Sequence, residues 1–315
     1  MSGERATTSI DPPQAVRARA LADGARGAAW LEALPQLAAE LARDWNLTLG
    51  RVLDGGTEAL VLEAILADGR TGVLKLTPPG RDQVRELAVL LAAGGRGYAQ
   101  VYAHDEGRGA LLLERLGPQL AQMGWSVERQ IAALCETLKA AWMAPPAGES
   151  FQTGAEKARA LAVFIAQTWE ELGRPCAERT IETALSYARL REAAFDPARA
   201  VLAHGDAHAW NALQVPGGEG FKFVDPEGLF IEPAYDLGIA MREWAQDLLA
   251  GDPVGLGARR CARLAELTGV EPEPIWQWGF MERTSTGLLA VKLGLAEGRE
   301  MLAVADAWGA GGLAD

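Results

Sequence analysis

The chain has 315 residues, of which 49% are apolar and 23% charged. These values are typical of a soluble globular protein with enough core for two lobes or two small domains. The net charge of −12 argues against a nucleic-acid partner, because phosphate backbones are bound by clustered Lys and Arg. An acidic surface instead suits a cationic small molecule.

Cysteine content and targeting signals exclude further classes of protein. Cys135, Cys176 and Cys261 form no C-x-x-C pair, so we expect small buried side chains and no disulfide framework. The first residues lack the apolar segment of a secretory signal. No uncharged apolar run reaches the ~20 residues that span a bilayer. We therefore expect a cytoplasmic protein that does not bind membranes.

The first 77 residues change from helical to β-type periodicity. Residues 1–24 are interpreted as a partly ordered lead, and residues 27–45 as an amphipathic helix in which Pro35 marks a kink or the start of a second helix. Two β-type runs, 60–62 and 73–76, are joined by the turn residues 68–72. Before them, Asp54 precedes a flexible turn formed by Gly55, Gly56 and Thr57. Such a turn would let backbone amides approach a phosphate, but Gly-Gly alone is a very weak signal, and a plain hairpin turn is the more common explanation.

Lys75 lies among apolar residues of the second β-type run. An unpaired ammonium is costly to bury, so Lys75 either faces solvent or has a function. Glu86 follows eleven residues later in a helical stretch, 83–92. A strand lysine paired with a helix glutamate is the device by which kinases hold the α and β phosphates of ATP.

The composition turns helical after residue 116. Strands are predicted at 98–104 and 109–115, and Gly117-Pro118 follows them. This predicts a domain at 1–116 and a second at 117–315. Helical periodicity in the second domain covers six stretches: 127–143, 156–172, 178–194, 234–250, 258–268 and 275–297.

Residues 204–225 contain the most informative motif of the chain. His204 and Asp206 are followed by Asn211 five residues after the aspartate, and Asp225 comes directly after an apolar strand. Kinase-type phosphoryl transfer needs this set: one carboxylate orients the attacking hydroxyl, while an amide and a second carboxylate hold the Mg²⁺ that bridges the ATP phosphates. The motif predicts Asp206 as the catalytic residue, Asn211 and Asp225 as metal ligands, and ATP and Mg²⁺ as cofactors.

Three other interpretations are considered. Each Asp or Asn taken alone is more often a cap or turn residue. His204, Asp206 and His208 resemble a cluster of metal ligands, which would suit a metal hydrolase, but the chain has only three histidines. A catalytically silent kinase-like binding module would not need Lys75 and the whole motif.

The same stretches resemble a known family. They occur in the expected order, as Val73-Leu74-Lys75-Leu76, Ala110-Leu111-Leu112-Leu113-Glu114-Arg115-Leu116, His204-Gly205-Asp206, Val224-Asp225-Pro226-Glu227 and Pro233-Ala234-Tyr235-Asp236-Leu237. The chain resembles the aminoglycoside phosphotransferase family, and within it the streptomycin 6-kinase and hydroxyurea kinase branch. The similarity runs over nearly the whole chain. Its motifs are specific for the superfamily and much less so for the phosphate acceptor.

The resemblance implies an α+β, bilobal, protein-kinase-like fold with a five-stranded antiparallel N-lobe and a mostly helical C-lobe. Glu114 and Leu116 would then belong to the hinge that meets the adenine. His204 and Asp236 would support the catalytic loop. Three positions depart from the family pattern and bear on the acceptor: Trp142, Trp210 and Glu232.

The resemblance also implies a small-molecule acceptor, such as an aminoglycoside, bound in the C-lobe beside Asp206. Charge-assisted hydrogen bonds to acidic side chains would suit a cationic acceptor, and homoserine, choline or a sugar are the metabolic alternatives. The candidate acceptor residues are His208, Glu227, Glu243 and Glu282, with Asp247, Trp244, Trp276 and Trp278 as further candidates. Trp276, Trp278 and Phe280 suit helix packing equally well.

Overall fold

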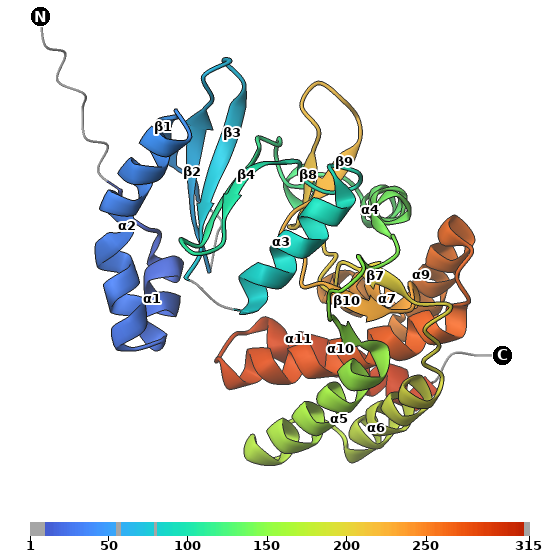
Figure 1. The fold of residues 1–315 in the computed structure, drawn as a ribbon. Helices are drawn as coiled ribbons and strands as arrows, with labels where there is room; N and C mark the ends of the chain where they lie inside the picture. Colours follow the sequence, from blue (N-terminus) through green and yellow to red (C-terminus); the bar gives the residue numbers. More distant parts are fainter. Residues whose placement is uncertain (1–9, 55–57, 79–80, 312–315) are drawn as a thin grey trace, which may run out of the picture. The chain divides into compact units, whose positions relative to one another are not determined.

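The computed structural model describes residues 10–54, 58–78 and 81–311. The chain divides into two compact units between Gly117 and Pro118 (Figure 1). The predicted α+β, kinase-like fold class, with an antiparallel five-stranded sheet followed by a helical unit, is confirmed. None of the described helices is both long and apolar enough to cross a membrane.

The first unit is built on one antiparallel sheet with the strand order β1-β2-β3-β5-β4. Its strands are β1 (Thr48–Val52), β2 (Leu60–Ile65), β3 (Thr71–Leu76), β4 (Val101–Asp105) and β5 (Ala110–Glu114). The β2–β3 hairpin forms as predicted, and Gly69 supplies the positive φ of +85° that its turn requires.

The two faces of this sheet carry different helices because side chains alternate along a strand. Leu74 and Leu76 of β3 pack with Leu34 and Leu41 of α2 (Ala25–Asp44) in one buried cluster. Lys75, between those two leucines, points to the opposite face, where it meets α3 (Arg81–Ala93).

The helical lead of the first unit differs from the prediction. Residues 14–22 form a regular helix, α1 (Gln14–Ala22), whose Val16 and Ala20 join the same buried cluster. The apolar side chains that pack against α1 belong to α2 and the sheet, so the local composition of residues 14–22 did not predict a regular helix. Pro35 lies inside α2 and does not start a second helix.

The second unit is mostly helical. Its helices are α4 (Val127–Ala141), α5 (Gly154–Glu171), α6 (Glu178–Ala193), α7 (Ala234–Arg242), α8 (Ala245–Leu249), α9 (Pro253–Thr268), α10 (Pro272–Lys292) and α11 (Glu297–Gly311), with a short 3-10 turn, η1 (Leu120–Gln122). Two small sheets accompany them, β6-β10-β7 and β8-β9: β6 (Gln152–Thr153), β7 (Val201–Ala203), β8 (Ala212–Gln214), β9 (Phe221–Phe223) and β10 (Leu229–Ile231).

Two predicted helices of this unit are corrected. The stretch 234–250 is split, because Trp244 adopts a left-handed conformation (φ +54°) between α7 and α8. The stretch 275–297 is α10 alone, which ends at Lys292, and α11 follows as a separate helix after Gly294 (φ +74°). Left-handed residues end helices in this way because they turn the chain out of the helical path.

Helices α7 and α10 pack closely through glycines. A Cβ placed on Gly238 would lie 2.8 Å from the Cβ of Trp278, and one on Gly279 would lie 2.4 Å from the Cβ of Met241. Both helices are buried over most of their length. This contact fixes the position of α7, which carries Asp236 and Arg242.

Candidate active site

His204 is a buried residue at the start of the predicted catalytic loop, directly after β7. Its Nδ1 accepts the backbone N–H of Asp206 (3.1 Å), so Nε2 carries the proton and donates to the carbonyl of Val224 (2.9 Å). Burial lowers the pKa of His204, in agreement with a neutral ring. Both nitrogens are used in these bonds, which leaves none for a metal. The metal-hydrolase interpretation of His204, Asp206 and His208 is therefore not supported.

Asp236, in the first turn of α7, holds the backbone of the loop. Its carboxylate accepts N–H groups from His204 (3.0 Å), Gly205 (2.9 Å) and the indole of Trp142 (2.9 Å). Burial raises the pKa of Asp236, and the donated hydrogen bonds oppose that rise. Gly205 needs its lack of a side chain, because it has a φ of +94° and a Cβ there would lie 2.8 Å from that of Glu227.

Both carboxylate oxygens of Asp206 contact a basic side chain. Arg242 Nη2, from the last residue of α7, lies 2.8 Å from Oδ1, and His208 Nε2 lies 3.1 Å from Oδ2. Burial alone would raise the pKa of Asp206, but His208 and Arg242 outweigh it and hold the pKa below its usual range. Asp206 is therefore an ionised, weakly basic group, which suits the orientation of a hydroxyl better than strong base catalysis.

Asn211 and Asp225 flank the β8–β9 hairpin. Ala212 pairs with Phe223 in that hairpin, and Val224 N donates to Asn211 O (3.0 Å), so the two predicted ligands lie at the same end. Asn211 Nδ2 donates to the backbone oxygen of Asp206 (3.1 Å), which turns the side-chain oxygen of Asn211 the other way. Asp225 is exposed and left-handed (φ +57°), a conformation that Asp tolerates better than most residues.

This donor set fits Mg²⁺ rather than a metal held by protein alone. Mg²⁺ prefers oxygen ligands and takes one or two carboxylates together with waters and substrate phosphates. Within residues 10–54, 58–78 and 81–311, no group of three or more His, Cys, Asp or Glu side chains is arranged to hold a metal ion. One amide oxygen and one carboxylate are what a nucleotide-bound magnesium ion requires.

Lys75 and Glu86 meet in the first unit as the sequence predicted. Lys75 Nζ lies 2.6 Å from Glu86 Oε1, and the two residues are 9% and 6% exposed. The structure thus brings the strand lysine and the helix glutamate together on the sheet face that α2 does not cover. Gly55, Gly56 and Thr57 lie outside the described residues.

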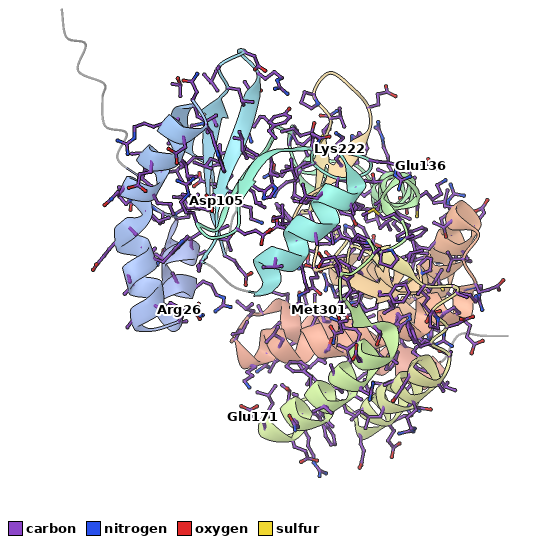
Figure 2. The ribbon with its side chains drawn as sticks, viewed as in Figure 1. Arg26, Asp105, Glu136, Glu171, Lys222 and Met301 are labelled. Carbon is purple, nitrogen blue, oxygen red and sulfur yellow. The ribbon has the colours of Figure 1, made fainter. Side chains whose placement is uncertain are left out.

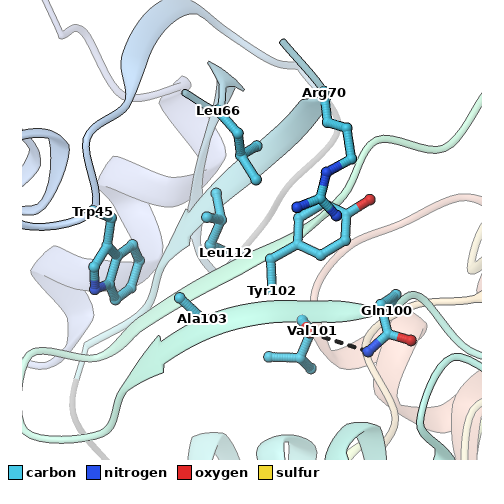
Figure 3. A pocket seen from close by; sticks show the side chains of 8 residues that line it. All are labelled: Trp45, Leu66, Arg70, Gln100, Val101, Tyr102, Ala103 and Leu112. Atoms are coloured by element: carbon cyan, nitrogen blue, oxygen red, sulfur yellow. Dashed lines mark hydrogen bonds between the residues drawn. The ribbon is translucent and has the colours of Figure 1, made fainter. Parts of the chain in front are cut away.

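The predicted hinge residues are ordered at the end of the sheet. Glu114 ends β5 and its side chain accepts the backbone N–H of Gln100 (2.9 Å), while Leu116 is buried. A hollow of about 510 Å³ opens elsewhere in this unit (Figure 3). Leu112, which lines it, pairs with Leu74, so the hollow lies on the sheet face opposite Lys75 and is separate from the Lys75–Glu86 pair.

The predicted acceptor residues fall into two groups. Glu227 is half exposed beside the catalytic loop. Glu243 and Glu282 instead face Arg242, at 3.2 Å from Nε and 3.8 Å from Nη1, and Glu282 is only 5% exposed. Glu282 also accepts the hydroxyl of Tyr235 (2.5 Å). Desolvation by the residues packed around Glu227, together with the carboxylates of Asp206 and Glu282, raises its pKa to about 7, although half of the side chain stays exposed.

The further candidates in α10 serve packing, whereas Asp247 belongs to an ion pair. Trp276, Trp278 and Phe280 are completely or almost completely buried in α10, so the packing interpretation of these three residues is the correct one. Asp247 pairs with Arg260 at 3.1 Å. Arg242 was not predicted, although a charged residue at the end of an otherwise buried helix was a usable signal.

Solved structures support the same class of fold. The chain is similar to an aminoglycoside phosphotransferase solved in a ternary complex with ADP and hygromycin B, with a TM-score of 0.59, 17% identity and coverage of 88% of this chain and 99% of the other. It is also similar to a choline kinase from Streptococcus pneumoniae (TM-score 0.57, 14% identity, 87% and 98% coverage). Fold and catalytic loop together define a kinase-like small-molecule phosphotransferase.

The family follows from the sequence comparisons. The family model of aminoglycoside/hydroxyurea antibiotic resistance kinases matches residues 44–293, and the chain belongs to this family. It is 29% identical to a streptomycin 6-kinase of Streptomyces glaucescens, over 94% of this chain and 95% of the relative. It is 30% identical to a hydroxyurea phosphotransferase of Kitasatospora aureofaciens, over 84% and 79%.

Proposed function

We propose that this chain transfers the γ-phosphate of Mg²⁺-ATP to a hydroxyl of an aminoglycoside such as streptomycin, as an antibiotic-resistance kinase. The observation that carries the proposal is the catalytic loop, in which Asp206 is kept ionised by Arg242 and His208 while Asn211 and Asp225 lie at one end of a hairpin. The relatives that bear streptomycin and hydroxyurea in their names support the acceptor class.

Each residue has a defined part in this mechanism. Asp206 hydrogen-bonds the acceptor hydroxyl and aligns it for attack, because phosphoryl transfer depends mainly on positioning and charge neutralisation. Asn211 and Asp225 hold the magnesium ion, and Lys75, held by Glu86, binds the phosphates. Bound Mg²⁺ supplies neutralisation of the phosphate charge. His204 and Asp236 keep the loop backbone fixed.

The remaining assignments follow from the same proposal. Glu114 and Leu116 are the hinge residues that meet the adenine, and Gly55, Gly56 and Thr57 cover the phosphates. The first unit is the N-lobe and the second the C-lobe. Acidic residues near Asp206 make the acceptor pocket attractive to a cation.

A transfer assay with purified protein tests this function. Radiolabelled ATP is supplied with Mg²⁺ and an acceptor panel of streptomycin, other aminoglycosides, hydroxyurea, homoserine, choline and a hexose. We expect transfer to streptomycin or a related cation, and none with Asp206→Ala. Transfer to a metabolite alone would replace the resistance role by a metabolic one. Mg²⁺-independent nucleotide binding in the wild type would contradict the kinase mechanism itself.

A further inference from the structure

Lys157 is a charged residue near Asp206 that the proposed mechanism does not use. It lies in the first turns of α5, and its side chain is 18% exposed. Its Nζ is 3.8 Å from Glu227 Oε2, 3.9 Å from Glu282 Oε1 and 5.4 Å from the centre of the Tyr235 ring. Both oxygen distances exceed hydrogen-bonding range, in contrast to the 2.8 Å between Arg242 and Asp206.

The hydrogen-bonding capacity of Lys157 is therefore not used up by its neighbours. An ammonium has three donors, and within the described part of the chain none of them makes a hydrogen bond with another residue. The two carboxylates balance its charge from 3.8 and 3.9 Å without taking these donors. A ligand oxygen can therefore accept a hydrogen bond from Lys157, which makes Lys157 a binding group rather than a finished structural ion pair.

Glu227 and Glu282 differ in what they offer to a ligand. Glu282 is buried and engaged by Tyr235 and Arg242. Glu227 is 50% exposed, so one face of its carboxylate is open. The backbone N–H of Glu227 donates to His204 O (2.8 Å), which ties the residue to the loop that carries Asp206.

The pair thus presents a donor and an acceptor side by side next to the catalytic aspartate. Lys157 would repel an acceptor whose flank carries only positive charge, because like charges in a partly desolvated site interact strongly. Glu227 would repel one whose flank carries only oxygen anions. A group that has an oxygen and an N–H close together satisfies both side chains.

We propose that Lys157 and Glu227 form a bipolar subsite that binds the flank of the acceptor beside its reactive hydroxyl. Lys157 takes a carbonyl or hydroxyl oxygen of the acceptor, and Glu227 takes an adjacent N–H or ammonium group. The chemical class is a hydroxyl compound with a neighbouring urea, amide or amino-alcohol group. This inference rests on the proposed function and specifies which acceptors that function serves.

Steady-state kinetics of charge variants test the subsite, with streptomycin and hydroxyurea as acceptors. We expect Lys157→Met and Glu227→Gln each to raise the KM for the acceptor at least tenfold and to leave the KM for ATP within twofold. Lys157→Arg, which keeps the charge and the donors, should recover part of the affinity. Thermal unfolding of each variant shows whether the fold is retained.

A charge swap separates recognition from a simple ion pair. The double variant Lys157→Glu/Glu227→Lys is made in a Glu282→Gln background, because Glu282 Oε1 lies 3.9 Å from Lys157 Nζ and would repel a glutamate there. In that background the swap restores the attraction, so a structural pair would regain both stability and acceptor KM. A ligand-binding pair would regain stability only, because the donor and the acceptor have exchanged places. The control is the exposed pair of Lys292 and Glu171, which joins α10 to α5 at 2.8 Å (Glu171 is labelled in Figure 2). Swapping it should leave both KM values unchanged.

The outcomes distinguish this inference from the proposed function. Transfer that is insensitive to Lys157→Met, or a swapped pair with a wild-type acceptor KM, would overturn the subsite and leave the kinase function intact. Wild-type protein that binds Mg²⁺-ATP and transfers phosphate to neither acceptor would overturn the acceptor class and the subsite together. A raised acceptor KM in Lys157→Met that the swap does not correct would support the subsite.

Discussion

Replacing Asp236 by asparagine should damage both stability and catalysis, and its cost follows from three hydrogen bonds. Oδ2 accepts from His204 N and Trp142 Nε1, and Oδ1 accepts from Gly205 N. An amide of the same size keeps one accepting oxygen. If that oxygen accepts from His204 and Trp142, the new NH₂ group faces the N–H of Gly205. The N–H of Gly205 then loses its acceptor, and the NH₂ group has none either, so two buried donors lack a partner.

Each buried group that loses its partner costs about 1–3 kcal/mol, so two of them cost about 2–6 kcal/mol. Removing a charge that is completely buried offsets part of this, which leaves an expected loss of about 3 kcal/mol. Natural domains are stable by only about 5–15 kcal/mol, so the variant should unfold at clearly lower urea. Its turnover should fall as well, because the lost hydrogen bond positions Gly205, the residue directly before Asp206.

Urea titration followed by far-UV circular dichroism measures the loss, with Trp142→Phe as the matched control. That control removes one of the three donors and leaves the carboxylate with the other two, so it should cost only about 1 kcal/mol. The reasoning is refuted if Asp236→Asn changes the unfolding free energy by less than about 1 kcal/mol, or if both variants cost the same.

The remaining predictions concern the chemistry and the charges around it. Asp206→Ala should lower turnover by orders of magnitude while ATP still binds, which a kinetic and a binding assay together would show. In calorimetry, Asp225→Ala should weaken Mg²⁺-ATP binding more than Asn211→Ala, because a full negative charge on the cation is lost. Glu282→Gln should lower kcat rather than raise the acceptor KM, because Glu282 is buried against the arginine that holds Asp206. Because the pKa of Glu227 is raised to about 7, the folded state favours its protonated form. The free energy that this protonation adds to folding is lost as the pH rises through 7. Glu227→Gln should therefore match the wild type in urea titrations at pH 4 and be more stable at pH 8, by roughly 1 kcal/mol after allowance for its half-exposed side chain; an equal difference at both pH values would contradict this.

The parts of the fold that sequence predicted are those fixed by short-range rules. The β2–β3 hairpin follows from a turn sequence between two apolar runs, and its strands pair from Leu60 with Leu76 to Ile65 with Thr71. Asn211 and Asp225 were predictable as neighbours for the same reason, since they border a hairpin whose register brings its two ends together. Local patterns thus specify the backbone that carries the proposed metal ligands.

The arginine partner of Asp206 was not predictable in this way. Arg242 reaches Asp206 across 36 positions of the chain, and only the packing of α7 against α10 sets its direction. Every residue of α10 from Ile275 to Ser285 is buried. This part of the helix therefore has no exposed polar face, and its sequence pattern cannot distinguish a buried glutamate from an exposed one. Glu282 therefore resembled a surface residue in the sequence.

The break between α7 and α8 has a tertiary cause as well. Arg283 Nη2 donates to the carbonyls of Met241 (2.7 Å) and Glu243 (3.0 Å), and Arg260 Nη1 donates to the carbonyl of Glu243 (2.8 Å). Cations at a helix C-terminus satisfy carbonyls that would otherwise continue the helix. Residues 234–250 keep helical periodicity through the break, so only these distant arginines reveal it.

Acceptor recognition in this chain is distributed differently from its chemistry. The residues proposed for phosphoryl transfer in the second unit lie within 22 consecutive positions, from His204 to Asp225, and short backbone hydrogen bonds order them. The charged groups that face an acceptor come instead from the separate helices α5, α7 and α10 and from the loop after β9. Substitutions of the charged residues on α5 and α10 can change the donors and acceptors near Asp206 without moving the loop backbone, because Asp236 in α7 and His204 hold that backbone. In the proposed mechanism a phosphotransferase of this design can therefore exchange one acceptor for another while Asp206, Asn211 and Asp225 keep their places. The motif then predicts the reaction, and the proposed subsite of Lys157 and Glu227 predicts the substrate.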